Sequence, residues 1–450
     1  MENKDAVYPD FPYHPAKQYP EFQFDEFLEQ NLVYNSIREA FHLLGLDENN
    51  FGSKNWNPLG SIIKLNDSVV IKPNFVEWKD NDLDFYTVTT HCSVIRTMID
   101  YTLIALKNTG KIIVAEAVQN STIYERIIKR NRVLDLISFY KSKGINNIEF
   151  RDVRNIRGDK RDPEGYTIEN LGNNSLYATW PKKKLRRLYG ADYNRKETIK
   201  AHTRGNNIYE LANTFLNADV LITIPKLKTH TKAGVSFCLK SFIGMMGNKN
   251  LVPHRSISSP KRNGDSYPAT HKLRVRLYLR LVQFYKDIFM TKGLKRIYSF
   301  CRKTTKIVLQ VKQKHLVVTQ GKWSGNNTLW PAIVDISNIW LKKDIRFFAV
   351  IDGILAGDKD GPIFPRPRKE GIVIVGDDYL ITDIASTYLI GIDPMKVKYL
   401  QYYIKNNKID YNSIEIKSNV NKYHTLFNLS REDTLKFEPT DAWATIKLSD

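Results

Sequence analysis

Short apolar runs rich in β-branched and aromatic residues recur along the chain, and each is bounded by polar or turn-forming residues. Five of these runs read as strands, at residues 68–72, 111–115, 219–224, 346–351 and 371–375. None alternates cleanly between apolar and polar positions, which is typical of strands covered on both faces. Apolar residues at helical spacing predict helices over residues 29–45, 93–108, 122–143 and 207–217. This order predicts an α/β protein with a mainly parallel sheet and flanking helices.

Two segments depart from this pattern. Residues 7–24 interleave Pro with Tyr and Phe, which disfavours helix and predicts an extended arm on the domain surface. A strongly basic stretch lies between the third and fourth predicted strands. The sequence therefore divides into an N-terminal arm and first helix, a first part of the α/β core, a basic helical insertion and a second part of the core, at residues 1–60, 61–270, 271–320 and 321–450.

The basic stretch, residues 272–314, contains thirteen Lys or Arg and one acid, Asp287. Apolar and polar positions at helical spacing on both sides of Lys292–Gly293 predict an amphipathic helical hairpin. One interpretation is that the hairpin packs on the main domain and turns its basic stripe to water. The other is that it lies on an anionic membrane surface. Nucleic acid ranks lower as a partner, because no recognised nucleic-acid-binding signature accompanies the charge.

Polar side chains follow each predicted strand, where ligands bind in open α/β sheets. They are Lys72 and Asn74 after the first strand, Glu116 after the second, Lys226, Lys228 and His230 after the third, Asp352 after the fourth and Asp378 after the fifth. Polar strand ends commonly just meet solvent. Five such ends in one sheet favour a shared cleft.

The third strand continues directly into cations. If the chain stays extended, Lys226, Lys228 and His230 point to one side, with consecutive Cβ atoms roughly 6–7 Å apart. From residue 235 onward the spacing becomes helical, and we expect the helix to start near residues 232–234. Lys240 on this helix stands among small residues, so it faces the same space. Ammonium groups and the free backbone N–H groups of a helix start both suit an anion.

Other ligand-binding and catalytic motifs have less support in the sequence. The chain contains no Gly-x-x-x-x-Gly-Lys-[Ser/Thr] loop, no Gly-x-Gly-x-x-Gly loop and no recognisable nucleophile elbow. His230 fits a general acid or base with a pKa lowered by the neighbouring lysines. A divalent metal held by His91, His230 or His254 with a carboxylate is an alternative, opposed by the local density of cations.

Charge and cysteine content limit the partners and the cellular compartment that suit the protein. Lys and Arg exceed Asp and Glu by twenty over 450 residues, which favours anionic partners. Cys92, Cys238 and Cys301 form no Cys-x-x-Cys pair, which excludes a standard zinc ribbon or ferredoxin-type cluster. The N-terminus lacks the pattern of a secretory signal, and no window approaches the roughly 18 apolar residues of a spanning helix. We expect a cytoplasmic protein, soluble or peripheral to a membrane.

Several motifs together resemble the domain of unknown function 362 family, some members of which carry a ferredoxin-like iron–sulfur module. The resemblance covers about residues 65–415 outside the basic insertion, and its most specific element is the Pro-Lys-Leu-Lys-Thr-His run at 225–230. Its other motifs are Ile-Lys-Pro-Asn at 71–74, Thr-Thr-His at 89–91, Leu-Lys-Ser-Phe-Ile-Gly at 239–244, Val-Ile-Asp-Gly-Ile at 350–354, Asp-Gly-Pro at 360–362 and Gly-Asp-Asp at 376–378 followed by Asp383.

The chain departs from the family in two ways. The family often has Lys-Asn-Leu-Phe-Gly where this chain has Lys-Ser-Phe-Ile-Gly at 240–244, and the cysteine-rich module is absent. The resemblance therefore implies the fold and the clustered residues, and no iron–sulfur cluster is expected.

The leading hypothesis is a cytoplasmic enzyme that binds a phosphorylated or carboxylated small molecule at the strand ends. The residues expected to hold this ligand are Lys72, Asn74, Lys226, Lys240 and Asp378. The residues expected to act on it are Lys228, His230, Glu116 and Asp352. Asp383 has a second interpretation, as the cap of a helix that begins near residue 384. The rival hypotheses are a non-catalytic peripheral protein that acts through the hairpin, and a redox partner that binds flavin or iron.

Overall fold

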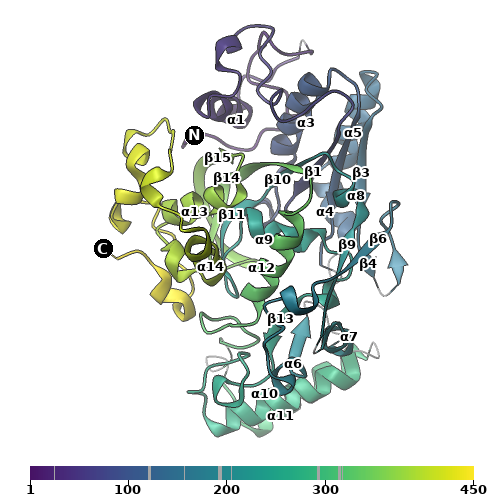
Figure 1. The fold of residues 1–450 in the computed structure, drawn as a ribbon, viewed down its shortest axis with the longest axis vertical. Coiled ribbons are helices and arrows are strands. Elements are labelled where there is room, and N and C mark those ends of the chain that lie inside the picture. Colours follow the sequence, from purple (N-terminus) through teal and green to yellow (C-terminus); the bar gives the residue numbers. More distant parts are fainter. Residues whose placement is uncertain are drawn as a thin grey trace.

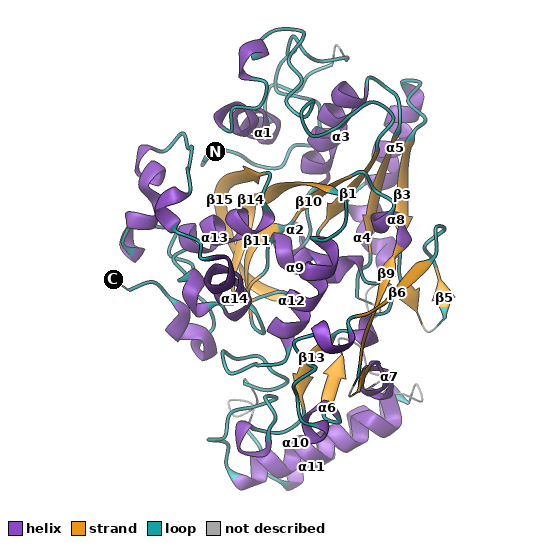
Figure 2. Ribbon diagram, in the orientation of Figure 1, coloured by secondary structure: helices purple, strands orange, loops and turns teal. Residues whose placement is uncertain are grey.

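The computed structural model describes residues 1–24, 26–119, 123–156, 158–190, 195–203, 205–290, 294–312, 316 and 318–449. Its centre is an eight-stranded sheet in the order β12-β11-β14-β10-β1-β2-β3, with β15 paired to β14 (Figures 1 and 2). The strands are β1 Ser68–Pro73, β2 Lys111–Glu116, β3 Ile148–Asp152, β10 Val220–Ile224, β11 Lys226–His230, β12 Gly234–Val235, β14 Arg346–Asp360 and β15 Phe364–Gly376. All pairs from β3 to β14 are parallel, which confirms the predicted fold class.

The long strand β14 has different partners on its two edges. On one edge β10 pairs with its first half and β11, which continues β10 after Pro225, pairs with its second half. Along the other edge β15 runs antiparallel, with Ala349 opposite Gly376 and Asp360 opposite Phe364. The carboxyl end of β15 therefore lies next to the start of β14, at the end of the sheet opposite the carboxyl ends of the parallel strands.

Helices cover both faces of the sheet, because consecutive strand residues point to opposite faces. On one face Val69, Ile71 and Ile112 join a core with α1 Leu32–Leu43, α3 Cys92–Leu106, α4 Tyr124–Arg130 and α5 Val133–Ser142. On the other face Val70 and Ile113 join a core with α9 Cys238–Ser241, α12 Leu329–Trp340, α13 Tyr379–Leu389 and α14 Lys398–Asn407. The near-continuous apolar runs in the sequence reflect this double coverage.

Smaller elements extend the molecule beyond the sheet. They are α2 Asp82–Val88, α6 Lys182–Leu185, α7 Arg195–Ala201, α8 Asn213–Leu216, β4 Asn155–Ile156, β5 Asp159–Lys160, β6 Tyr166–Asn170, β7 Leu188–Gly190, β8 His202–Thr203, β9 Asn206–Ala212 and β13 Pro253–Ser256. The basic insertion forms α10 Leu273–Tyr285 and α11 Lys295–Val308, which contact each other at one end of the molecule (Figure 1). Across the described ranges, no helix has both the length and the apolar character needed to cross a bilayer.

Three of the helices expected from the sequence differ in the structure. Residues 207–217 form β9 and the short α8, because β9 pairs with β6 and this pairing overrides helical spacing. The helix predicted over 122–143 is two helices, broken where Arg132 has a φ of 55°; residue 122 lies outside the described residues. The helix expected to start near 232–234 starts at Cys238 instead, because Gly234 has a φ of 89° and belongs to β12.

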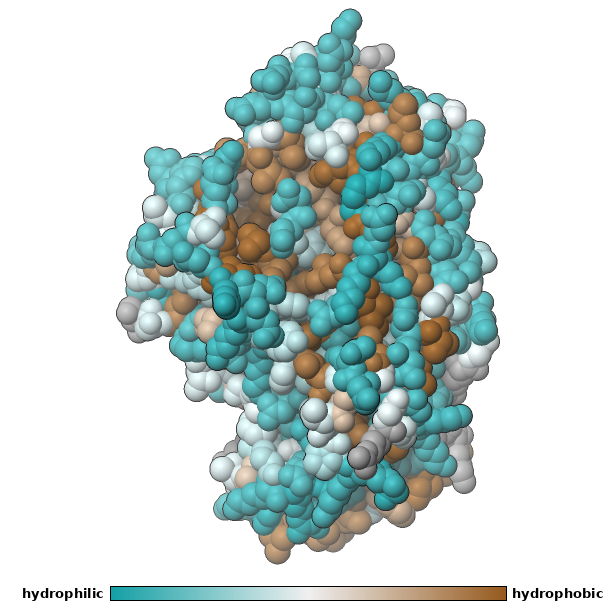
Figure 3. Space-filling view, viewed as in Figure 1, coloured by the Kyte–Doolittle hydropathy of each residue, from teal (hydrophilic) through white to brown (hydrophobic). Residues whose placement is uncertain are grey.

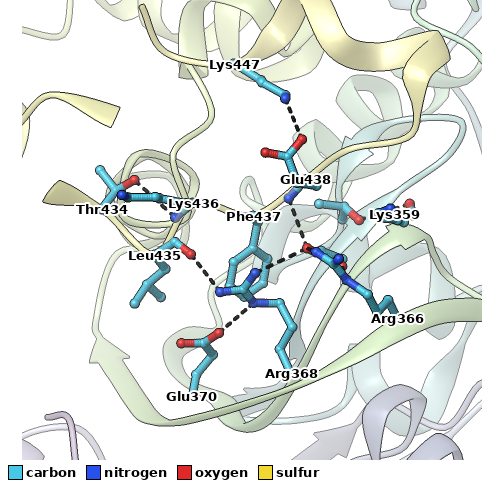
Figure 4. A network of polar contacts seen from close by, with 12 residues as sticks. Lys359, Arg366, Arg368, Glu370, Thr434, Leu435, Lys436, Phe437, Glu438 and Lys447 are labelled. Carbon is cyan, nitrogen blue, oxygen red and sulfur yellow. Dashed lines mark hydrogen bonds and ion pairs between the residues drawn. The ribbon is translucent and has the colours of Figure 1, made fainter. Parts of the chain in front are cut away.

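Both terminal segments form hydrogen bonds with β14 of the sheet. Residues 7–24 form neither helix nor strand over their described positions, as expected of an extended arm. Near the other end of the chain, Asp358 on β14 is buried and accepts hydrogen bonds from Arg366 at 2.8 and 2.6 Å and from the backbone N–H of Glu438 at 3.0 Å. Figure 4 shows this network, in which Arg368 bridges Glu370 and the carbonyl oxygen of Leu435.

Candidate functional site

A buried ion pair joins the ends of β1 and β2. Nζ of Lys72 lies 2.7 Å from Oε2 of Glu116, and both side chains are almost fully buried. Gly244 packs directly against the pair, since a Cβ at this position would lie 2.6 Å from Nζ of Lys72 and 2.7 Å from Oε1 of Glu116. A larger residue at this position would therefore displace the ion pair. Gly244, one of the small residues near Lys240 in the sequence, leaves room for the Lys72–Glu116 ion pair of the protein itself.

A second buried pair joins β11 and β14, which places Lys226 opposite Asp352. Nζ of Lys226 lies 3.0 Å from Oδ2 of Asp352, and neither side chain is exposed. Tyr8 of the N-terminal arm completes the group: it donates a 2.6 Å hydrogen bond to Oδ1 of Asp352 and accepts a 2.7 Å bond from Lys226. The ring of Tyr8 stacks on His91 at 4.2 Å. Burial raises the pKa of the Tyr8 hydroxyl well above its usual value, which keeps this hydrogen bond donor protonated.

Sequence reasoning missed Tyr8. It interpreted residues 7–24 only as an arm on the surface, and a Tyr-Pro pair carries no signal of contact with a carboxylate 344 positions away.

Lys228 is fully buried between these two pairs and has no carboxylate of its own. The one hydrogen bond of its Nζ goes to the carbonyl oxygen of Val88 at 3.4 Å, and no described carboxylate lies within 4.0 Å. The amide of Asn74 donates to the same carbonyl at 2.8 Å, so Asn74 and Lys228 meet at the end of α2. Burial lowers the pKa of Lys228 well below its usual value, and Lys240, Lys226 and Lys72 lower it further, whereas Glu116 raises it.

Lys240 approaches the same space from α9. It is half-buried, and its Nζ makes no hydrogen bond or ion pair with the described residues. Burial, together with the charge of Lys72, lowers the pKa of Lys240 to about 8. Lys228 and Lys240 are therefore cations without a counter-charge among the described residues.

His230 lies at the end of β11 and holds the turn that follows. Its Nδ1 accepts hydrogen bonds from the backbone N–H groups of Lys232 at 3.0 Å and Ala233 at 3.2 Å. The hydrogen of the neutral ring is therefore assigned to Nε2. Burial lowers the pKa of His230 well below its usual value, and Lys240, Lys232 and Lys228 lower it further. At neutral pH His230 is thus a neutral hydrogen-bond donor.

These bonds correct one expectation from the sequence. The backbone N–H groups near residues 232–234 were expected to be free for an anion, but those of Lys232 and Ala233 bond to His230. The N–H groups at the start of α9 are also occupied, since Cys238 and Leu239 donate to Asp383 at 2.7 and 3.1 Å. These four backbone N–H groups are therefore not available to a ligand.

Asp378 lies away from the other residues predicted for the site. It follows β15, whose antiparallel direction carries it to the opposite edge of the sheet. There it is exposed, and its Oδ1 accepts a 2.9 Å hydrogen bond from the N–H of Ile381 as the N-cap of α13. The expectation that all five strand ends share one space does not hold for Asp378.

Asp383, expected either in the site or as a helix cap, does cap a helix, but not the one predicted. It lies within α13 and accepts the two N–H bonds at the start of α9, the element that carries Lys240. Burial raises the pKa of Asp383 to about 7. Asp383 therefore positions Lys240 rather than touching the cluster itself.

Replacing Asp383 tests this positioning role. We expect Asp383→Ala to lower the free energy of unfolding by about 1–3 kcal/mol, because two buried N–H groups lose their acceptor. Urea denaturation measures this change. Ser386→Ala is the matched control, since Ser386 is buried on the same helix and its Oγ has no partner among the described residues, so its loss is expected to leave stability unchanged. Equal losses in both variants would contradict the role of Asp383.

A second group of cations consists of Lys232, in the turn after β11, and Arg255 on β13. Burial, together with the charge of Arg255, lowers the pKa of Lys232 to about 7. Arg255 is buried, donates to Oγ of Ser266 at 3.1 Å and to Gln283 of α10 at 2.9 Å, and lies over the ring of Tyr189. Sequence reasoning did not single out Arg255, which has no neighbouring motif.

The described residues form no cluster that could hold a metal ion, and their cysteines form no disulfide. No three His, Cys, Asp or Glu side chains of the described residues gather in a way that could hold a metal ion. Cys92 and Cys238 are buried and Cys301 is half-buried, and all three are free thiols.

The fold and the site define an α/β protein with a buried group of lysines at the carboxyl edge of a mainly parallel sheet. Residues 165–388 match the model of the family described as Domain of unknown function (DUF362), and the chain belongs to this family. The match confirms the resemblance in the sequence over a shorter range, which includes Lys226, Lys228 and Lys240 and begins after Lys72. No curated protein matches the chain.

Proposed function

We propose that the protein binds a phosphorylated or carboxylated small molecule in the lysine cluster, defined as Lys72, Lys226, Lys228 and Lys240, and that this molecule is the substrate of an enzyme reaction. The observation that carries the proposal is the imbalance of charge. Lys72 and Lys226 each have a buried carboxylate, whereas Lys228 and Lys240 have none among the described residues. A buried cation without a partner is costly, so the cluster is completed by an anion from outside.

The two ion pairs have a supporting role in this proposal. Glu116 and Asp352 are each occupied by a lysine of the protein, so Lys72 and Lys226 are fixed in place and add positive potential. Lys228 and Lys240 are the groups with unused N–H donors. Asn74 orients the ligand beside Lys228, because both side chains meet at the carbonyl oxygen of Val88.

The perturbed pKa values of Lys228 and His230 support catalysis at this site. Lys228 and His230 are buried, and the pKa of each is well below its usual value. Such perturbed groups cluster at active sites. The hydrogen bonds at Nδ1 of His230 leave the neutral Nε2–H to donate a hydrogen bond to the ligand, which favours a donor to negative charge over a general base.

Isothermal titration with inorganic phosphate, pyrophosphate and citrate tests the binding. We expect Lys240→Ala to weaken the tightest of these anions by about 10- to 100-fold, the size of a lost charge-assisted hydrogen bond. Lys405→Ala, at an exposed position of α14, lowers the net charge equally and is expected to change affinity less than twofold. If none of the three anions binds the wild-type protein, or if both variants weaken binding equally, the proposal is wrong.

The pKa of Lys240 gives a pH dependence with a definite sign. Because that pKa is about 8 in the free protein, Lys240 is charged below pH 8 and loses its proton as the pH rises above it. We therefore expect the affinity for sulfate, whose charge is constant over this range, to fall by up to about tenfold per pH unit above pH 8. In Lys240→Ala this decline should disappear. Titrations at pH 7, 8 and 9 measure it, and a rise in wild-type affinity would contradict the assignment.

A further inference from the structure

The hairpin formed by α10 and α11 is held together by few buried contacts. Its small core consists of Val275, Tyr278 and Val311, and the hydroxyl groups of Tyr285 and Thr305 lie 3.2 Å apart between the helices. The break predicted at Lys292–Gly293 lies outside the described residues. The hairpin lies at the end of the molecule farthest from α1 and α3 in Figure 1.

Helix α11 is amphipathic, yet none of its residues is buried. The apolar stripe of this helix is turned outward: Ile297 is 45% exposed, Phe300 70%, Ile307 75% and Val308 71%. A helix of this length ordinarily draws its stability from burying such a stripe. The structure therefore leaves the apolar face of α11 without a cover among the described residues.

Helix α10 adds apolar side chains to the same end of the molecule. Leu273, Leu277 and Phe284, spaced four and seven residues apart, are all exposed. Figure 3 shows apolar surface along the rim of the molecule at that end, among hydrophilic atoms. We call the exposed apolar residues of both helices the apolar face of the hairpin: Leu273, Leu277, Phe284, Leu294, Ile297, Phe300, Ile307 and Val308.

The charges around this face identify what covers it. Seven exposed Lys or Arg residues occupy the described part of the hairpin: Lys272, Arg280, Lys295, Arg296, Arg302, Lys303 and Lys312. On α11, Arg296 and Lys303 flank the apolar stripe, and Lys295 and Arg302 lie on the opposite face of the helix. A second copy of the chain would bring like charges together. Nucleic acid would match the charge but leave the large aliphatic and aromatic side chains in water. An anionic lipid surface matches both features.

We propose that the hairpin is a membrane-binding device, whose apolar face inserts among the acyl chains of an anionic bilayer while the surrounding lysines and arginines contact lipid phosphates. Each cation near such a surface adds about fivefold to the affinity, so binding depends steeply on the fraction of anionic lipid. The lysine cluster lies on other elements, β1, β11 and α9, so this proposal is independent of anion binding there.

Flotation of the full chain with lipid vesicles tests the proposal. We expect the protein to float with vesicles that mix phosphatidylcholine and phosphatidylglycerol, to bind pure phosphatidylcholine at least tenfold more weakly, and to be released by 1 M salt. Phe300→Ser/Ile307→Ser is expected to reduce binding to the mixed vesicles at least tenfold. Arg302→Glu/Lys303→Glu is expected to reduce it at least about 25-fold.

Matched control variants distinguish insertion of the hairpin into the membrane from a general loss of exposed apolar surface or positive charge. Leu134→Ser/Ile168→Ser replaces two apolar side chains outside the hairpin that are more than half exposed, and Lys405→Glu/Lys408→Glu reverses two exposed charges of α14 and its C-cap. Neither is expected to change flotation more than twofold. All side chains replaced are exposed, so circular dichroism should show unchanged melting temperatures.

Three results would overturn the proposal. One is that the wild-type protein does not float with the mixed vesicles. The second is that the hairpin and control variants lose binding equally. The third is that light scattering shows a dimer that Phe300→Ser/Ile307→Ser dissociates while vesicle binding stays intact, because the apolar face would then be covered by a second copy. Sulfate titration of the hairpin variants should be unchanged, which distinguishes failure here from failure of the anion site.

Discussion

Lys226→Met is expected to lower the free energy of unfolding by about 3–5 kcal/mol, the largest loss expected from a single substitution in the site. The substitution leaves the Asp352 carboxylate at a position with no exposure, where its ion pair with Lys226 at 3.0 Å is gone. The hydrogen bond from Tyr8 remains and does not neutralise a charge. Urea denaturation followed by tryptophan fluorescence measures the change.

The double variant Lys226→Met/Asp352→Leu is the control for this prediction. It removes both charges and leaves groups of similar volume, so stability is expected to return to within about 1–2 kcal/mol of the wild type. A single variant as stable as the wild type would show that Asp352 does not need the charge of Lys226. In that case the assignment of a structural role to this pair would be wrong.

Lys228→Met is expected to act in the opposite direction on stability and to abolish anion binding. Nζ of Lys228 has one weak hydrogen bond and no described carboxylate within 4.0 Å, so its burial is a cost that methionine removes. We expect the unfolding free energy to rise by about 1–3 kcal/mol. The affinity for the tightest anion is expected to fall at least about 100-fold, because Lys228 is fully buried and no described carboxylate neutralises its charge.

The two effects are measured together by thermal unfolding with and without the anion. At a concentration of 100 times the dissociation constant, the wild-type protein gains about 2.7 kcal/mol from the ligand, and Lys228→Met is expected to gain nothing. Lys405→Met on the exposed surface should keep the full gain. If Lys228→Met is destabilising and still binds the anion, Lys228 serves the fold rather than a ligand.

The opposite signs expected for these neighbouring lysines show why residue type alone is a poor guide in this site. Lys226 and Lys228 are two positions apart on one strand and both are fully buried. They differ in what the other elements bring to them: Asp352 from β14 for Lys226, and only the carbonyl oxygen of Val88 for Lys228. Under the proposed function, this difference makes Lys228 rather than Lys226 the cation that contacts the ligand.

The limits of the sequence are clearest at β15 and at α11. The apolar run at 371–375 predicts a strand, and the strand is there, but its antiparallel direction moves Asp378 to the opposite edge of the sheet. The spacing of residues after Lys292–Gly293 predicts an amphipathic helix, and α11 is there, but only its exposure reveals that none of the described residues covers its apolar stripe. Strand direction and exposure are properties of neighbours in space. The four domain ranges drawn from the sequence stay predictions.

The sequence by itself determined the hydrophobic periodicity of the helices and strands, the fold class and the family. These depend on patterns and motifs that lie within a few adjacent residues. The sequence also determined that Lys72, Glu116, Lys226, Lys228, His230 and Asp352 lie near one another, since parallel strands end at a common edge. Only the tertiary structure decided the partners: Lys72 with Glu116, Lys226 with Asp352 and Tyr8, His230 with its own turn, and Lys228 with no described carboxylate. Pairing depends on distances of a few ångströms between elements that lie up to 344 residues apart in the chain, which no local pattern encodes.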